Sequence, residues 1–353
     1  MSEYDKKKVL TVLGWIDPTD VGVTLSHEHL CCSAEPFMVR GPAKEFPELG
    51  TEPLSLKHNW WVTHNPYSSF DNVKLYEESE AVIDELKFFK SNGGCTVVEN
   101  SSIGFQPNPE KLYDYSSKSG VNIVAGTAFY VRSARPETVD YSQEKFGEAM
   151  LKDITEGFGT TNIRAGVIGE IGCSWPLEET EKSVLRAAAQ IESDIGCPVL
   201  IHPGRHAEAP FDIIRIYTEA GGHVDRVVMS HLDRTIYDDS KLLEFAEMGC
   251  YVEYDQFGLE TSYYQLCEEI DMPSDAQRIQ KIKVLVDGGF EDRLTIGHDI
   301  HTKHRLMKYG GTGYSHILLH VAPKMLQRGI TQTQIDKILK DNPKRWLTFT
   351  KQI

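Results

Sequence analysis

The sequence lacks the features that mark secreted and membrane proteins. Its first ten residues, MSEYDKKKVL, contain no apolar run of signal-peptide length. No stretch of about eighteen apolar residues occurs, which argues against a membrane-spanning helix. The seven cysteines are an odd number and form no CxxC pair, which argues against a disulfide framework or a structural zinc ribbon. We therefore expect a cytosolic protein in a reducing compartment.

Basic residues are also scarce. Lys and Arg number 37 against 52 Asp and Glu, which gives a formal net charge of −15. Nucleic acid and anionic membranes bind basic patches, so this balance argues against both as partners. A small-molecule substrate is still compatible, because a pocket can be locally positive on an acidic protein. A homo-oligomer is equally compatible.

The composition of the chain gives no sign of a domain boundary. Hydrophobic residues make up 40% and charged residues 25%, which is ordinary for a globular protein, and no low-complexity linker interrupts the sequence. A chain of 353 residues can bury most of the surface that its unfolded form exposes. We expect a single domain over residues 1–353.

Short apolar runs recur along the chain, and helical patterns lie between them. Most runs are rich in β-branched residues and apolar almost throughout, as expected of parallel strands buried on both faces. Four of the helical patterns cover 77–91, 178–195, 240–247 and 276–286, each ended by a nearby glycine. The eight runs are 23–25, 96–99, 122–126, 165–169, 198–201, 226–229, 250–254 and 293–296.

Eight strands that alternate with helices predict a (β/α)8 TIM barrel, with a doubly wound open sheet as the alternative. Residues 31–72 separate the first strand from its helix and are rich in Pro, Trp, Tyr and His. An insertion at this point lies over the barrel mouth, either as a lid or pocket wall or as an ordinary packed excursion. Residues 331–349 predict a closing helix followed by DNPKRWLTF.

The segment SHEHL ends the first strand and carries His27 and His29. Residues i and i+2 of a strand point to the same side, so both imidazoles can face one metal ion inside the barrel mouth. Taken alone, the pair is equally compatible with core or surface histidines.

Four more candidate ligands close other predicted strands. His202 ends PVLIH, His231 ends VVMSH, Glu170 ends GVIGE and Asp299 ends LTIGHD. Barrel enzymes place their catalytic groups at the carboxyl ends of the strands, where all eight strands meet one rim. We therefore predict a metal site built from all six residues.

Imidazole and carboxylate suit zinc, and also manganese, cobalt or iron. Six ligands are too many for one catalytic ion with an open position, but they suit two divalent ions about 3.5–4 Å apart. Glu170 can bridge such a pair with its two oxygens. A water shared by the two ions would lose a proton near neutral pH and become a nucleophile, and Asp299 can accept that proton. Glu170 and Asp299 are thus the candidate catalytic residues.

The other histidines carry weaker signals. His298 should point away from the site, because it alternates with Asp299 along the strand, and a supporting or core role is expected for it. His58 and His64 could reach the pocket from the insertion. Cys31 and Cys32 are expected to be structural, and Ser26 lies in no GxSxG motif. The histidines without a strand-end pattern are expected to be surface or packing residues: His206, His223, His301, His304, His316 and His320.

Segments from nearly end to end resemble one known family. They include LSHEHL, GVIGEIGCSWPL, GCPVLIHPGR, VVMSHLDRTI and DNPKRWLTF. With these motifs, the chain resembles the phosphotriesterase branch of the amidohydrolase superfamily. The resemblance implies a binuclear metal-dependent hydrolase on a TIM barrel.

The resemblance also implies how the ligands divide. It places His27, His29 and Asp299 on one ion, and His202 and His231 on the other. Glu170 stands where phosphotriesterase itself has a bridging carboxylated lysine, and the glutamate supplies the same unit charge. Two ions are still expected, but organophosphate hydrolysis is less favoured as the native activity.

Members similar to this chain hydrolyse N-acetyltaurine to taurine and acetate, with some N-acetyl amino acids as lesser substrates. An anionic tail of that kind needs a cation. Arg234 and Arg205 are the first candidates, followed by Lys303 and Arg305, with Tyr130 as a pocket wall; each cation could instead form an ordinary salt bridge. Two alternatives stay open: a lactonase or phosphoesterase with the same site, and a non-catalytic binding protein, which the complete ligand set disfavours.

Overall fold

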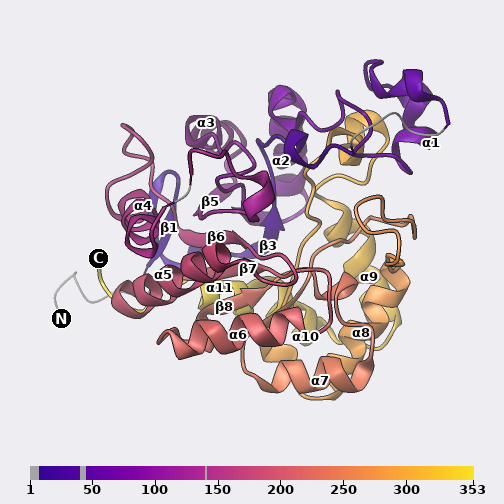
Figure 1. Ribbon diagram of the computed structural model, residues 1–353. Helices are drawn as coiled ribbons and strands as arrows, with labels where there is room; N and C mark the ends of the chain where they lie inside the picture. The colour runs from indigo at the N-terminus through magenta and orange to yellow at the C-terminus, as the bar shows by residue number, and fades with distance from the viewer. Residues whose placement is uncertain (1–7, 40–44, 140) are drawn as a thin grey trace.

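The computed structural model describes residues 8–39, 45–139 and 141–353, and its centre is a sheet of eight parallel strands (Figure 1). The strands pair in sequence order from β3 to β10. Every predicted strand is confirmed, with ends that differ by a few residues. The bounds are β3 Val23–Glu28, β4 Gly94–Glu99, β5 Asn122–Thr127, β6 Val167–Gly172, β7 Val199–His202, β8 Val227–Met229, β9 Tyr251–Tyr254 and β10 Leu294–Ile296.

The first and last strands of this sheet meet and close a barrel. The Asp299 amide donates to the His27 carbonyl oxygen at 3.1 Å, and the Ser26 hydroxyl donates to the Ile296 carbonyl oxygen at 2.9 Å. Gly297 lies at this junction, and a Cβ there would come within 2.6 Å of the His27 carbonyl oxygen. A side chain at this position would therefore push the two strands apart, so the closure requires glycine. The TIM barrel prediction is confirmed.

Each barrel strand is followed by a helical segment, and the helices surround the strands (Figure 1). The four helices predicted from the sequence begin and end within two residues of their observed bounds. The closing segment 331–349 is also helical. The α-helices are α1 Asn59–Val62, α2 Ser79–Ser91, α3 Pro109–Ser119, α4 Gln143–Thr155, α5 Glu179–Ile195, α6 Ala209–Glu219, α7 Asp239–Glu247, α8 Asp275–Asp287, α9 Ala322–Gln327, α10 Gln332–Asp336 and α11 Asn342–Leu347; π-helical turns Ile317–Val321 and Lys337–Asp341 precede α9 and α11.

A layer of buried side chains fills one end of the barrel. Six adjacent strands, β4 to β9, each contribute one member, namely Val98, Val124, Val167, Leu200, Val228 and Tyr251. Parallel strands present alternate side chains to the interior, so members from neighbouring strands meet in one layer.

Two segments outside the barrel cover this layer. Val9 comes from a hairpin of β1 (Val9–Thr11) and β2 (Gly14–Ile16), which the sequence did not predict. Trp346 of α11 donates its indole N–H to the carbonyl oxygens of Val199 and Arg226 at 3.2 and 3.1 Å. In Figure 1, β1 lies on the left and α1 at the upper right, so the insertion that carries α1 lies on the other side of the barrel from this hairpin.

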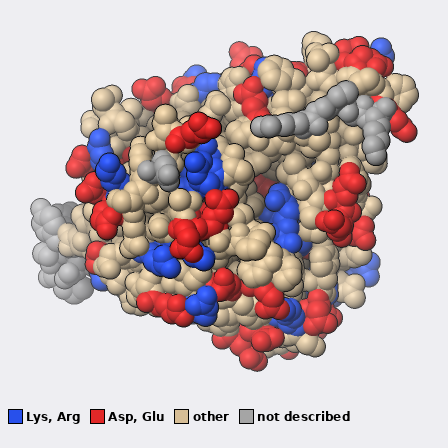
Figure 2. Space-filling view, viewed as in Figure 1, with Lys and Arg blue, Asp and Glu red and all other residues tan. Residues whose placement is uncertain are grey.

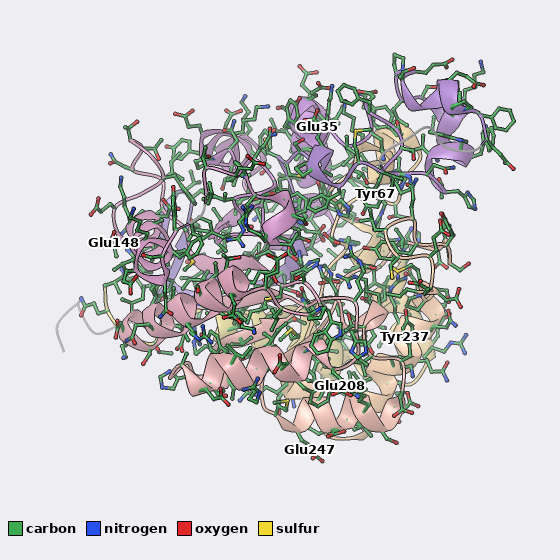
Figure 3. All side chains as sticks on the ribbon, in the orientation of Figure 1. Glu35, Tyr67, Glu148, Glu208, Tyr237 and Glu247 are labelled. Atoms are coloured by element: carbon green, nitrogen blue, oxygen red, sulfur yellow. The ribbon has the colours of Figure 1, made fainter. Side chains whose placement is uncertain are left out.

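The described part of the insertion consists of short helical turns, Glu35–Phe37, Pro47–Gly50 and Leu56–His58, together with α1. Among its contacts with the loop after β10, Asp71 lies 2.7 Å from the ammonium group of buried Lys303, which also lies 2.6 Å from Glu77, just beyond the insertion. In Figure 3, Tyr67 of this segment lies above the barrel, whereas Glu148, Glu208 and Glu247 lie at the outer helices.

Acidic and basic side chains are interspersed on the face in Figure 2, and a hollow lies between them. Within the described residues, no helix combines the length and the apolar character needed to cross a membrane.

Candidate metal centre

His27, His29 and Asp299 come together at the junction of the first and last strands. The Nε2 atom of His29 lies 3.2 Å from Asp299 Oδ1, and Nε2 of His27 lies 3.9 Å from the same oxygen. All three side chains are buried, and one ligand atom from each fits within a sphere of metal-binding size. Asp299 has a left-handed backbone, with φ of 54°.

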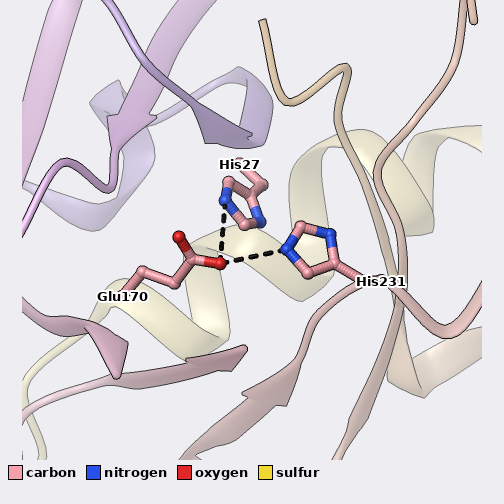
Figure 4. A group of neighbouring side chains, drawn as sticks. All are labelled: His27, Glu170 and His231. Carbon is pink, nitrogen blue, oxygen red and sulfur yellow. Dashed lines mark hydrogen bonds and ion pairs between the residues drawn. The ribbon is translucent and has the colours of Figure 1, made fainter. Parts of the chain in front are cut away.

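Glu170 and His231 form a second group with His27 (Figure 4). Glu170 Oε1 lies 3.0 Å from His231 Nε2 and 3.6 Å from His27 Nε2. The pairing of β6 with β7 is irregular between Ile168 and Ile171, and such irregularities re-aim a side chain. His231 likewise has a left-handed backbone, with φ of 56°.

Glu170 lies within reach of all four predicted histidine ligands. Its Oε1 atom is 2.8 Å from His202 Nδ1, and its Oε2 atom is 4.0 Å from His29 Nε2. A carboxylate in this position can contact two ions at once. The structure thus brings all six predicted ligands into one cluster.

Two buried atoms in the cluster lack a hydrogen-bond partner among the described residues, namely His27 Nε2 and Glu170 Oε2. Buried polar atoms are rarely left unsatisfied, and a divalent cation would satisfy both. Burial alone would raise the pKa of Glu170, but His27 and His202 hold it well below its usual value. Burial lowers the pKa of His202 to about 3. His202 is therefore neutral, the form in which imidazole binds a metal ion, whereas neighbouring carboxylates raise the pKa of His27 and that of His231 to about 9, so these two rings would release a proton on binding one.

The Asp255 carboxylate hydrogen-bonds to the Nδ1 atoms of two predicted ligands. Its Oδ2 lies 2.9 Å from His27 Nδ1, and its Oδ1 lies 2.8 Å from His231 Nδ1. A carboxylate on Nδ1 fixes the tautomer and directs Nε2 of each ring toward the cluster. The sequence analysis missed Asp255, although it follows the run 250–254 in the same strand-end position as the predicted ligands.

His29 has a comparable support. Its Nδ1 lies 2.9 Å from the Ser101 hydroxyl, which donates to Glu99 Oε1 at 2.5 Å. This chain turns His29 Nε2 toward Asp299. Neither Ser101 nor Glu99 was predicted, although Glu99 closes the run 96–99 in the same strand-end position as Glu170.

A cavity open to solvent adjoins the cluster, with about 390 Å³ of empty space that includes part of the opening. Aromatic side chains from the insertion and the strand-end loops form much of its wall, including the predicted Tyr130. The lining residues are His29, Phe37, Tyr67, Phe105, Tyr130, Glu170, His202, Arg205, His231, Arg234, Gln256, Tyr264, Leu266, Asp299 and His301.

The expectation that His301 is a surface or packing residue is wrong. It lines the cavity, with Nδ1 3.2 Å from Asp299 Oδ1 and Nε2 2.8 Å from the Tyr67 hydroxyl. The sequence indicated that His301 could lie at the site, because it follows Asp299 by two residues. His298 instead packs against Glu28 at 2.6 Å, away from the cluster.

The candidate histidines and cysteines of the insertion do not line the cavity. His58 lies 3.2 Å from Glu52 and His64 lies 3.1 Å from the Trp60 carbonyl oxygen, and neither lines the cavity. Cys31 and Cys32 are buried, and burial raises the pKa of Cys31 to about 11, which agrees with a structural role.

Among the described residues, the cations that line the cavity are Arg234 and Arg205. Arg234 is 1% exposed, and its Nε and Nη1 atoms lack a hydrogen-bond partner in the described part of the chain. Arg205 donates from Nε and Nη2 to the Tyr264 hydroxyl at 3.1 and 2.6 Å. Lys303 is engaged by Asp71 and Glu77, and Arg305 donates to the carbonyl oxygens of Phe257 and His298, so neither reaches the cavity. The structure thus leaves Arg234, which lines the cavity, with buried donors that lack a hydrogen-bond partner among the described residues.

Comparison with known proteins covers almost the whole chain. A profile described as the Phosphotriesterase family matches residues 7–347. The N-acetyltaurine hydrolase of Homo sapiens is 50% identical over 348 residues, covering 97% of this chain and 98% of that protein. The N-acetyltaurine hydrolase of Danio rerio is 51% identical over 350 residues, covering 99% and 100%.

Solved structures also match almost the whole chain. A resiniferatoxin-binding protein from Rhodobacter sphaeroides superposes with a TM-score of 0.92 at 28% identity, covering 97% of this chain and 95% of that one. A phosphotriesterase homology protein from Escherichia coli, complexed with phosphate in its active site, superposes with a TM-score of 0.76 at 25% identity, covering 94% and 100%. The architecture of the whole chain is therefore shared with these two proteins.

Proposed function

The chain belongs to the phosphotriesterase family, and from this premise we propose that it hydrolyses the amide bond of N-acetyltaurine to taurine and acetate. Some other N-acetyl amino acids are lesser substrates in this proposal. The observation that carries it is one cavity with the carboxylate–imidazole cluster on one wall and the unpartnered donors of Arg234 on another.

The proposed centre holds two divalent ions, most simply zinc, with manganese, cobalt or iron as alternatives. His27, His29 and Asp299 would hold one ion, and His202 and His231 the other, with Glu170 between them. Support comes from Glu170, which lies within 4.0 Å of a ring nitrogen of all four histidines. When bound, such ions polarise the acyl carbonyl and lower the pKa of a water molecule.

Asp299 is the proposed proton acceptor. Water adds to the carbonyl carbon, and the carboxylate of Asp299 takes its proton. The C–N bond then breaks, and that proton goes to the leaving nitrogen. His301, 3.2 Å from Asp299 Oδ1, holds the carboxylate in place from the cavity side.

The anionic tail of the substrate is assigned to the two arginines. Arg234 offers unpartnered Nε and Nη1 donors, and guanidinium matches an oxyanion with several acceptors. Arg205 lies on the same cavity and already donates two hydrogen bonds to one oxygen of Tyr264. The sulfonate would sit between them, which positions the acetyl group toward the cluster.

The test is metal content together with turnover of N-acetyltaurine, for wild type, His202→Ala and His206→Ala. His206 is exposed and stacks on Trp175, so its replacement is the matched control. We expect about two ions per chain and turnover in wild type and the control, and loss of turnover in His202→Ala. Two ions without amide turnover would redirect the proposal to lactones and phosphoesters, and metal-replete protein without bound ions would overturn it.

A further inference from the structure

We propose that Tyr67 is a positioning residue for the reaction: its hydroxyl donates to Nε2 of His301 and thereby holds the Nδ1–H of His301 on Asp299. This inference rests on the proposed function, in which Asp299 accepts the proton of water. It gives the insertion of residues 31–72 a part in catalysis as well as in the cavity wall.

His301 connects the insertion to Asp299. Its Nδ1 atom lies 2.8 Å from the Asp299 carbonyl oxygen and 3.2 Å from Oδ1 of the same residue. Its Nε2 atom lies 2.8 Å from the Tyr67 hydroxyl. Tyr67, His301 and Asp299 all line the cavity. A chain of hydrogen bonds therefore runs along the cavity wall from the insertion to the proposed proton acceptor.

The partners of the two ring nitrogens decide which atom donates in each hydrogen bond. A carbonyl oxygen and a carboxylate oxygen only accept, so Nδ1 of His301 carries a hydrogen. A neutral imidazole has one N–H, so Nε2 is the acceptor and the Tyr67 hydroxyl is the donor. Without this donor, the ring can exchange to the Nε2–H tautomer or rotate. Either change removes the N–H from Asp299.

The backbone of Tyr67 is held at both its N–H and its carbonyl group, which fixes the origin of the side chain. The Tyr67 N–H donates to Gln265 Oε1 at 2.9 Å, and the Tyr67 carbonyl oxygen accepts the Val39 N–H at 3.0 Å. Gln265 also donates from Nε2 to the Ser68 hydroxyl at 2.6 Å. Gln265 belongs to the loop between β9 and α8, so the insertion and this loop together hold Tyr67 beside His301.

A positioning role predicts a loss in the chemical step with substrate binding retained. The anionic tail is assigned to Arg234 and Arg205, and neither guanidinium has a hydrogen bond to the Tyr67 hydroxyl within the described ranges. Removing that hydroxyl should therefore leave KM nearly unchanged. Because Asp299 would lose its oriented N–H partner, kcat should fall.

The kinetic experiment compares Tyr67→Phe with wild type on N-acetyltaurine. We expect kcat to fall about 10- to 100-fold and KM to change less than about 3-fold. Tyr115→Phe is the matched control, because it removes a buried hydroxyl that donates to Ser79 at 2.8 Å and does not line the cavity. Its kcat should stay within about 3-fold of wild type. An unchanged kcat in Tyr67→Phe, or a loss confined to KM, would overturn the proposal.

A double variant tests whether Tyr67 acts through His301. Once His301→Leu has removed the ring, adding Tyr67→Phe should lower kcat by less than about 2-fold more. Losses that multiply in the double variant would show that Tyr67 acts by another route. Metal analysis and thermal unfolding accompany each variant. If Tyr67→Phe loses its ions or its fold, the hydroxyl supports the structure and the positioning role is excluded.

A readout without turnover separates this inference from the proposed function. Nitrogen-15 NMR of histidine-labelled, zinc-loaded protein reports the hydrogen on each ring nitrogen, with His301→Leu to assign the signals. We expect wild type to carry the hydrogen of this ring on Nδ1, and Tyr67→Phe to populate both tautomers. A wild-type ring with its hydrogen on Nε2 contradicts this inference whatever the substrate. The expected ring in a wild type that does not turn over N-acetyltaurine contradicts the proposed function instead.

Discussion

Asp255 and His27 are joined at the ring nitrogen Nδ1, which lies 2.9 Å from Asp255 Oδ2. The other oxygen of the same carboxylate lies 2.8 Å from Nδ1 of His231. One buried residue therefore sets the tautomer of two rings at once. Their Nε2 atoms, which face Glu170, are left to bind a cation.

Asp255→Asn should weaken metal binding about 10- to 100-fold. The amide presents N–H donors to one of the two rings and forces that ring to carry its proton on Nε2, where the ion would bind. Competition with a chelator, followed by metal analysis, measures the effect. Asp84→Asn on exposed α2 is the control, and equal metal retention in both variants would contradict the role given to Asp255.

Arg234→Ala should raise KM for N-acetyltaurine more than for a neutral N-acetyl amine of the same length. Its unpartnered donors are assigned to the anionic tail, so a substrate without the charge has less to lose. Steady-state kinetics on the two substrates measures the difference, expected at about 10-fold or more for a charged hydrogen bond. An equal loss on both would show that Arg234 supports the cavity and does not bind the tail.

Much of the fold and the cluster could be predicted because both depend on local patterns. A run such as 198–201 is buried on both faces, and the histidine that closes it must lie at the rim of the barrel. The sequence did not predict the hairpin β1–β2, because its three-residue strands are too short to show an alternation of apolar and polar residues. Asp255 follows a predicted strand as the ligands do, but its support of His27 and His231 depends on partners in other segments, which its own segment does not reveal.

Glu85 should make stability depend on pH. Burial raises its pKa from 4.5 to about 7, so the folded state binds more protons than the unfolded state between these values. Unfolding free energy should therefore fall as pH rises from about 4.5 to 7, by at most about 3 kcal/mol. Glu85→Gln should remove this slope in thermal unfolding from pH 5 to 8. Glu80→Gln on the same helix should keep it, and a slope that survives in Glu85→Gln would exclude this origin.

Lys303→Met should loosen the attachment of the insertion to the barrel. The ammonium group is buried and contacts Asp71 at 2.7 Å and Glu77 at 2.6 Å. Losing these charge-assisted bonds should cost about 1–3 kcal/mol and speed proteolytic cleavage within 45–72. Lys308→Met, which removes a half-exposed ammonium from Glu78, is the control. Cleavage at the wild-type rate would show that other contacts hold the insertion.

The left-handed backbones of His231 and Asp299 place two of the proposed metal ligands where glycine would fold with less strain. Substitutions that stabilise the fold at these two positions would therefore reduce turnover. A library selected only for surviving heat should accumulate glycine at positions 231 and 299, whereas one selected for product should retain His and Asp. Variants with higher thermal stability and full turnover would then need stabilising substitutions on the outer helices, away from the rim of the barrel.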